Sequence, residues 1–417
     1  MKTVARIFIS LIILHILSFP AAAQSQRLIT GIIKDDATKS PIPFVSVSLK
    51  HKFIGTSTND DGAFDFYIPE DAADDTLVIN SLGYRSVYFA VNTIDKSIMV
   101  ALKSNLIELK EVVITPLNPT DYIRLALRMA KFNYPDKPFQ TEAYYRSRLN
   151  ENGEIINLEE AIIKSYYPNY QDTLHNQHQV LLFQRADERE IQFMKAKRDK
   201  KNAKRVAKGQ TIDDKEKVNI VNSFGGPEDL LELDVIKSKE DFLDSAQFKE
   251  FKYEFDQPSS YQGRELIVIK FKSKGKTDHM RSEGKIYIDF QTYAIVNLEY
   301  NADFVIPLMV RPVIFAAGYG VENPVFYKKV NYQLINGKWY PKNLQFNIDV
   351  KIERKYMFKA NEHGDFYAEG IFSINKITVG NVSMIPVEKR YTTKKKMEEQ
   401  VHNDNGITWN GMNIIKK

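Results

Sequence analysis

Residues 344–353 read LQFNIDVKIE and alternate apolar with polar side chains along their whole length. Successive side chains of a β-strand point to opposite faces of the sheet, so this stretch predicts a strand with one apolar face and one solvated face. Residues 251–256 alternate in the same way, and Asn336-Gly337 is typical of a two-residue hairpin turn. We therefore expect residues 139–390 to form a large, curved antiparallel sheet that is open like half of a barrel.

The composition agrees with a mostly β protein. Of the 417 residues, 43% are hydrophobic and 27% charged, which is enough apolar material for packed cores. The 25 Phe, 22 Tyr and 2 Trp suit pleated, half-buried surfaces better than helical bundles. A net charge of +5 is too small for this length to indicate a nucleic-acid partner. The chain has no cysteine, which excludes disulfides, thiolate chemistry and cysteine-ligated metals.

The first residues have the pattern of a secretory signal. Lys2 and Arg6 precede an apolar run from Ile7 to Phe19, and small residues follow at Ala21–Ala23. We therefore expect residues 1–23 to be a signal peptide. The run is shorter than the ~18 apolar residues that a spanning helix needs. This pattern predicts an exported protein, located in the periplasm or associated with the outer membrane.

Residues 24–115 consist of short alternating stretches separated by turn residues. Residues 45–49 and 64–68 each alternate apolar with polar side chains. Between them, the run Asn59-Asp60-Asp61-Gly62 combines side chains that hydrogen-bond their own backbone with a glycine that tolerates positive φ. The pattern predicts a hairpin at this turn and a small β-sandwich overall.

Four motifs occur in order within this region: GIIKD at 31–35, PFVSV at 43–47, GTSTNDDGAFDF at 55–66 and SLGY at 81–84. Together they resemble the carboxypeptidase-regulatory-like domain. The resemblance implies a seven-stranded, transthyretin-like β-sandwich of the kind found in envelope proteins of Gram-negative bacteria. It also implies a module rather than an enzyme, because this domain carries neither the zinc nor the chemistry of the carboxypeptidases that it accompanies.

A helical linker is expected at residues 116–138, with Thr120 as its N-cap and its end near Pro135. The junction at residues 133–146 resembles that of longer envelope proteins whose C-terminal region has no known function. Residues 391–417 are expected to form a charged tail. The alternation beyond residue 139 also fits an outer-membrane β-barrel, and we keep that alternative open here.

The apolar face of the large sheet is the first candidate site. We expect a non-enzymatic protein of the cell envelope that uses this face to bind an apolar ligand, such as a lipid, or a protein partner. The candidate ligand-binding residues are Phe251, Tyr253, Phe255, Phe346 and Ile348. The same residues also fit an ordinary core covered by a helix.

A basic insert at residues 185–217 is the second candidate. Eight of the fourteen residues from 195 to 208 are cationic, with Asp199 as the single acid. These cations are Lys195, Lys197, Arg198, Lys200, Lys201, Lys204, Arg205 and Lys208. Two interpretations are open: a solvated helix or loop, or a contact with an anionic membrane surface or acidic partner. Nucleic acid is not expected, because the segment lacks aromatic residues for base stacking.

Catalytic patterns are weak. His175 and His178 would point to opposite faces of a strand, so we expect two polar surface histidines rather than metal ligands. Gly275-Lys276-Thr277 lacks the leading glycine of a phosphate loop and reads as a turn. We predict no catalytic residue, metal or cofactor. The alternatives to a binding protein are a hydrolase whose site is assembled from distant residues, and a structural adaptor.

Overall fold

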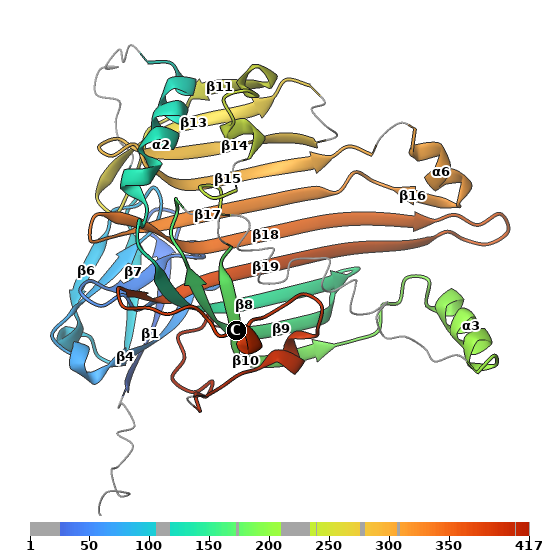
Figure 1. The fold of residues 1–417 in the computed structure, drawn as a ribbon, viewed down its shortest axis with the longest axis horizontal. Helices are drawn as coiled ribbons and strands as arrows, with labels where there is room; N and C mark the ends of the chain where they lie inside the picture. The colour runs from blue at the N-terminus through green and yellow to red at the C-terminus, as the bar shows by residue number, and fades with distance from the viewer. Residues whose placement is uncertain are drawn as a thin grey trace, which may run out of the picture.

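The protein consists of a small β-sandwich and a large open sheet (Figure 1). This computed structural model describes residues 26–105, 117–171, 175–209, 234–238, 240–275, 280–306, 309–404 and 406–416. The predicted signal peptide, as well as Lys276 and Thr277 of the predicted turn, lies outside these ranges. Within them the chain is mostly β, as its alternating pattern predicts.

The small unit is the predicted seven-stranded sandwich. Its strands are β1 (Gln26–Asp35), β2 (Ser46–Leu49), β3 (Gly55–Ser57), β4 (Ala63–Pro69), β5 (Thr76–Asn80), β6 (Val87–Ala90) and β7 (Ser97–Leu102). One sheet has the order β4-β1-β7 and the other the order β3-β2-β5-β6. Val47, Phe64 and Phe66 are fully buried between them, because alternate residues of each strand point inward.

The turn at residues 59–62 is present, but the predicted hairpin is wrong. The Asn59 side chain accepts hydrogen bonds from the N–H groups of Asp61 (3.1 Å) and Ala63 (2.8 Å). Gly62 has a φ of +70°, and a Cβ there would lie 2.3 Å from the Ile33 carbonyl oxygen, so only glycine fits. The strands on either side, β3 and β4, belong to different sheets. The turn therefore carries the chain across the sandwich instead of pairing its neighbours.

The large sheet contains twelve strands among the described residues. They are β8 (Phe139–Glu151), β9 (Glu154–Tyr167), β10 (Gln177–Glu188), β11 (Phe251–Phe255), β12 (Ser259–Tyr261), β13 (Arg264–Ser273), β14 (Met280–Asp289), β15 (Ile295–Phe304), β16 (Tyr319–Val321), β17 (Val325–Ile335), β18 (Lys338–Arg354) and β19 (Glu362–Val379). The order is β10-β9-β8-β19-β18-β17-β15-β14-β13-β11, with β12 paired to β13 and β16 to β18. All pairings within it are antiparallel, and β10 and β11 are its two edges. The sheet is thus open rather than a closed cylinder.

The predicted turn at Asn336-Gly337 joins β17 to β18. Both residues have positive φ, 49° and 80°, which matches the right-handed twist of the flanking strands. The stretch that opens with Leu344 forms the centre of β18, which has 17 residues and is one of the longest described strands.

Three α-helices are described: α2 (Pro119–Asn133), α3 (Lys195–Val206) and α6 (Arg311–Ala316). The short 3-10 helices are η1 (Glu70–Ala72), η2 (Val91–Thr93), η3 (Asp241–Leu243), η4 (Phe248–Glu250), η5 (Val387–Lys389) and η6 (Met397–Gln400). The N-cap of α2 is Asn118 and not Thr120 as predicted, because Pro119 is suited to the first helical position. The Asp121 carboxylate accepts a hydrogen bond from the Asn118 N–H at 3.1 Å.

The two faces of the large sheet have different neighbours. We call the face that carries Leu344 and Ile348 the inner face, and the face that carries Gln345 the outer face. Helix α2 crosses the inner face near the end where the sandwich lies (Figure 1). The sandwich contacts the outer face, where the Ser57 hydroxyl lies 3.4 Å from both Asn343 Oδ1 and Ser373 Oγ. We call the half of the sheet at this end proximal and the half that extends toward α6 distal.

The C-terminal segment packs against both units. Ile415 is 1% exposed and lies in an apolar cluster with Tyr144 and Ile162 of the outer face. Lys416 forms an ion pair with Asp65 of the sandwich at 2.9 Å. The predicted charged tail is therefore a strap that connects the sandwich to the sheet.

Candidate binding surface

The proximal half of the inner face is filled by the protein's own chain. The Phe242 ring of η3 stacks on Phe271 with centroids 4.0 Å apart and meets the edge of Tyr300 at 5.0 Å. Ile123 and Ala126 of α2 belong to the same buried cluster. This half of the face is an ordinary hydrophobic core.

A buried carboxylate fixes the chain segment that fills this half. Asp234 is 1% exposed and accepts hydrogen bonds from the hydroxyls of Tyr332 (2.6 Å) and Tyr170 (2.7 Å). Burial raises the pKa of Asp234, and the two tyrosine hydroxyls counteract part of that rise. Because both phenols come from elements of the sheet domain, Asp234 positions residues 234–238 on the inner face.

A polar row marks the border of the filled half. The Tyr300 hydroxyl donates to Glu240 Oε1 at 2.6 Å, and the Lys328 ammonium lies 3.4 Å from the same oxygen. The ammonium also lies 5.5 Å from the centre of the Tyr300 ring. Phe346 is paired with Lys328 across β17 and β18, so it lies in this row. Glu240, the Tyr300 hydroxyl and the Lys328 ammonium therefore bind one another, and apolar side chains lie beyond them on the sheet.

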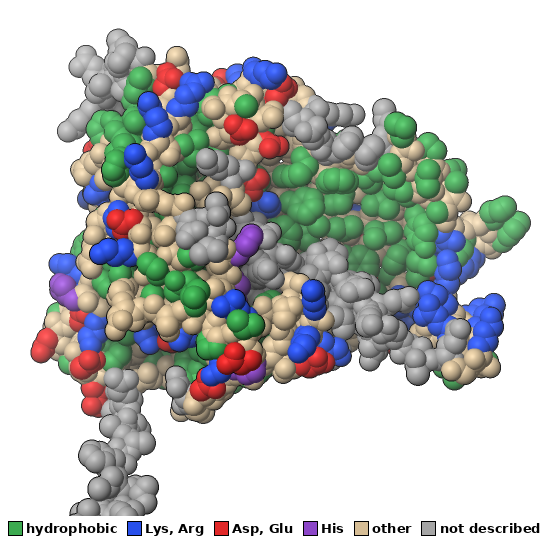
Figure 2. Space-filling view, in the orientation of Figure 1, with side chains coloured by type: hydrophobic (Ala, Val, Ile, Leu, Met, Phe, Trp, Pro, Cys, Tyr) green, Lys and Arg blue, Asp and Glu red, His purple; other side chains and the backbone are tan. Residues whose placement is uncertain are grey.

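The distal half of the inner face carries one apolar row across five neighbouring strands. The strand pairings place these residues side by side in the order Ala302, Phe326, Ile348, Ala368 and Leu149. The Phe326 and Phe346 rings lie 5.9 Å apart. Four members of the row, all except Phe326, are buried, whereas Phe304 and Met280 further along are 39% and 37% exposed. Figure 2 shows a continuous hydrophobic surface over this part of the sheet.

The structure separates the five predicted ligand-binding residues. Phe251 is 3% exposed in the filled half, and the Tyr253 hydroxyl donates to the Phe242 carbonyl oxygen at 2.8 Å. Phe255 is 48% exposed at the edge of the sheet and packs against Tyr122 of α2. Of the five, only Ile348 lies in the distal row, and Phe346 lies next to it in the border row beside Lys328. The binding surface proposed below therefore includes these two and leaves out the three residues of β11.

Sequence reasoning missed Ala302, Phe326, Ala368 and Leu149. Only Ala302 lies in a cleanly alternating stretch, LEYNADF at 298–304, so only its face could be read from the sequence. The register between strands distant in sequence could not, because alternation is unchanged by a shift of two residues. A row across five strands becomes visible only when that register is known.

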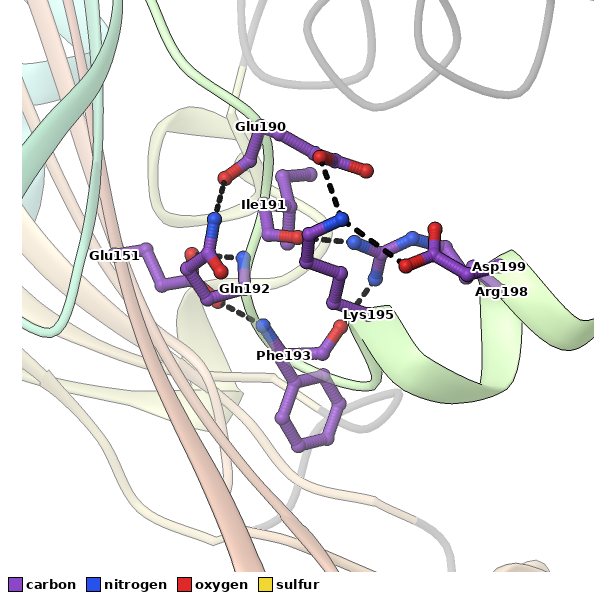
Figure 3. Close-up of polar contacts among 8 residues, drawn as sticks. All are labelled: Glu151, Glu190, Ile191, Gln192, Phe193, Lys195, Arg198 and Asp199. Atoms are coloured by element: carbon purple, nitrogen blue, oxygen red, sulfur yellow. Dashed lines mark hydrogen bonds and ion pairs between the residues drawn. The ribbon is translucent and has the colours of Figure 1, made fainter.

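Part of the predicted basic insert forms α3, and its residues 210–217 lie outside the described ranges. Helix α3 has no buried residue and is anchored through the segment before it (Figure 3). The Glu151 carboxylate at the end of β8 accepts the N–H groups of Gln192 (2.6 Å) and Phe193 (2.5 Å). The Lys195 ammonium lies 3.0 Å from both Glu190 and Asp199, and hydrogen bonds to these two carboxylates raise its pKa. The segment before α3 thus fixes the start of a helix whose Lys197, Lys200 and Lys204 are exposed.

Seven of the eight predicted cations lie on α3, and Lys208 follows in the turn after it. Lys197, Lys200 and Lys204 are exposed. The eight are therefore brought together, whereas the predicted ligand-binding residues are not. Proximity of so many like charges is unfavourable in isolation, and an anionic surface would relieve it.

The two histidines differ in their surroundings. His175 is exposed, as predicted, but His178 is 6% exposed, so the prediction of two surface histidines is wrong. The segment after residue 390 covers β10, where the Tyr391 N–H donates to the His178 carbonyl at 2.7 Å. Burial lowers the pKa of the His178 imidazole to about 3.

His178 Nδ1 lies 2.9 Å from Ser165 Oγ, a separation that a nucleophile and its base could use. Ser165 is fully buried, however, so its hydroxyl is not accessible to a substrate in this structure. Among the described residues, no group of three His, Cys, Asp or Glu side chains could hold a metal ion. No helix in the described ranges is both long and apolar enough to cross a membrane.

The fold thus defines a protein with an N-terminal β-sandwich followed by a large, open antiparallel sheet. Residues 29–114 match the family model of the CarboxypepD_reg-like domain, which confirms the resemblance carried by the four motifs. No curated protein matches the chain.

Two solved structures align with it at low similarity. A DUF1329 family protein from Desulfovibrio piger is 12% identical, with 64% of this chain and 96% of that chain covered and a TM-score of 0.24. A protein of unknown function from Bacteroides fragilis is 11% identical, with 85% of this chain and 99% of that chain covered and a TM-score of 0.16. We base no functional argument on alignments at these scores.

Proposed function

We propose that the protein is a non-enzymatic binding protein of the cell envelope, and that the distal half of the inner face holds the acyl chain of a lipid. The observation that carries the proposal is the contrast between the two halves of one sheet face. The proximal half is covered by α2 and η3, whereas Phe304 and Met280 of the distal half are 39% and 37% exposed.

The chemistry of the row supports holding a ligand rather than transforming it. Its members, from Ala302 to Leu149, carry no titratable side chain and no nucleophile. Burial of a methylene contributes about 0.8 kcal/mol. Burial of ten methylenes would therefore contribute about 8 kcal/mol, from which the cost of association must be subtracted. This contribution is similar in size to the binding free energy of a micromolar complex.

The location proposed for the protein follows from its N-terminal half. Lys2 and Arg6 before the apolar run support export, and the CarboxypepD_reg-like match supports a place in the cell envelope. A lipid is the apolar ligand most abundant in that compartment. We therefore favour a lipid over a protein partner as the occupant of the inner face.

Native mass spectrometry after incubation with phospholipid vesicles tests the proposal. The wild-type protein should retain a phospholipid, and Phe304→Asp and Phe326→Asp should each reduce retention about tenfold, since loss of about 1.4 kcal/mol suffices for that change. Val325→Asp is the matched control, because Val325 is 42% exposed and points to the outer face next to Phe326. Equal retention by all three variants, or no retention by the wild type, would refute the proposal.

A further inference from the structure

The distal end of the sheet carries exposed apolar side chains on two separate elements. Met357 and Phe358, in the connection between β18 and β19, are 85% and 97% exposed. Val313 and Phe315 of α6 are each 66% exposed. Single exposed apolar residues are common, but four at one end of a molecule indicate a contact surface. We call residues 354–359 together with α6 the distal tip.

Contacts within the distal tip hold these side chains in place. The Lys355 N–H donates to the Gly318 carbonyl at 2.9 Å, and the Lys355 ammonium lies 5.2 Å from the centre of the Phe315 ring. The Arg354 guanidinium lies 4.4 Å from the centre of the Tyr319 ring. The β18–β19 connection and α6 therefore form one body, so their apolar side chains project together.

Helix α3 is attached to the same end. The Met194 N–H, at the start of α3, donates to Glu362 Oε1 at 2.6 Å, and Glu362 is the first residue of β19 after the tip. The Phe193 ring meets Phe366 edge-on at 6.1 Å. The cations of α3 consequently lie beside the distal tip, where Figure 2 shows Lys and Arg side chains next to the hydrophobic surface.

The charges at this end are predominantly positive. Residues 354–359 contribute three cations and no acid, and the eight cations around α3 are accompanied by Glu190 and Asp199, which both pair with Lys195. The nearest acids on β18 and β19 have partners of their own: Glu353 binds Asn361 Nδ2 at 2.8 Å, and Glu362 binds the Tyr356 hydroxyl at 2.9 Å. The surface is thus complementary to a layer of anionic groups above an apolar interior.

We propose that the distal end docks on an anionic lipid bilayer, with Met357, Phe358 and α6 inserted among the acyl chains and the α3 cations on the phosphates. Shallow insertion and electrostatic attraction are each weak, and stable attachment to a membrane needs two such signals. The apolar row of the inner face leads toward this same end through Val350 and Phe366. Docking would therefore direct the proposed lipid-binding surface at the bilayer, although docking itself does not depend on that surface holding a lipid.

Vesicle binding by the purified protein separates the two signals. Wild type should bind phosphatidylcholine vesicles more tightly when they contain phosphatidylglycerol. The pair Met357→Ser and Phe358→Ser should weaken binding at least about tenfold, and so should the triple change Lys197→Glu, Lys200→Glu and Lys204→Glu. Each variant carries the same N-terminus, so any contribution from residues 7–19 is common to all of them.

Matched controls lie on the sandwich, at the opposite end of the molecule (Figure 1). Met99 is 74% exposed, so Met99→Ser removes another highly exposed apolar side chain. Lys50, Lys96 and Lys103 are exposed, and their change to Glu alters the net charge as much as the α3 triple does. Both controls should bind as the wild type does. Binding that falls equally in controls and test variants would overturn the proposal.

Quenching of tryptophan by brominated acyl chains reports insertion directly. The indole introduced by Phe358→Trp should be quenched by vesicles of brominated lipid, and the one introduced by Met99→Trp should not. Absence of quenching at position 358, with binding lost only in the lysine variant, would overturn membrane insertion and favour an acidic protein partner. Because lipid retention by Phe304→Asp is a separate readout, failure of docking and failure of the proposed function can be distinguished.

Discussion

At the scale of single residues, the burial of His178 has a measurable effect on how stability depends on pH. Its imidazole is buried beside Ser165, and burial lowers its pKa to about 3 from an ordinary value of 6.5. Because the unfolded chain binds a proton that the folded protein does not, stability should fall as pH decreases from about 6.5 toward 3. The slope from this one group is about 1.4 kcal/mol for each pH unit.

Replacement of His178 should remove that slope. Between pH 6 and pH 4 the wild type should lose roughly 2–3 kcal/mol more stability than His178→Gln, as measured by urea unfolding at each pH. Identical pH dependence in the two proteins would contradict the burial of the imidazole. His175→Gln is the control, since that side chain is exposed and its replacement should leave the pH dependence nearly unchanged.

The wrong placement of His178 from the sequence has a physical cause. His178 was expected at the surface, but it lies on β10, an edge strand whose backbone is covered by the segment around Tyr391. An uncovered edge exposes unpaired backbone groups, so proteins cover it. Which segment does so depends on contacts between residues more than 200 positions apart, and these leave no local pattern.

At the scale of elements, the carboxylates of Glu151 and Glu362 both hold the start of α3, and Glu151 accepts the larger number of backbone N–H groups. Glu151 is 4% exposed and accepts two backbone N–H groups just before the helix. Hydrogen bonds to a charged acceptor contribute about 1.5–3 kcal/mol each. Glu151→Ala should therefore raise hydrogen exchange in residues 191–206 at least about tenfold, while exchange in the sandwich is unchanged.

Glu154→Ala is the matched control for this change, because Glu154 lies on the same hairpin and its side chain is 79% exposed. Its ion pair with Arg189 spans 3.8 Å at the surface and should contribute little. Similar exchange in the two variants would show that α3 is not anchored through Glu151. The sequence alone identified the cations of this helix, but the anchor lies on β8, far from them in the chain.

Elements with local signals were predicted well. The hairpin turn was predicted from Asn336-Gly337, two residues that accept positive φ. The strand β18 was predicted from the alternation of apolar and polar residues at 344–353. The hairpin expected at Asn59 was wrong, although the turn itself is present, because a turn motif does not determine which strands pair. The local residues thus determine that a turn forms, and the packing of the two sheets determines which strands it connects.

At the scale of the whole molecule, the sequence predicted a sandwich followed by an open antiparallel sheet. It could not predict that the proximal half of the inner face is covered. The covering segment is fixed by hydrogen bonds from Tyr170 and Tyr332 to Asp234, and both tyrosines are far from Asp234 in the sequence. Nor could it predict that Ile415 and Lys416 connect the sandwich to the outer face. On the distal half of the inner face, by contrast, Phe304 and Met280 remain 39% and 37% exposed at the end of the apolar row.

Photocrosslinking with a phospholipid that carries a diazirine in its acyl chain tests this central claim most directly. After irradiation and digestion, peptides that contain Phe304, Phe326 and Ile348 should carry the label. Label confined to the outer face around Val325 or to the filled half around Phe251, or no label at all, would contradict the account.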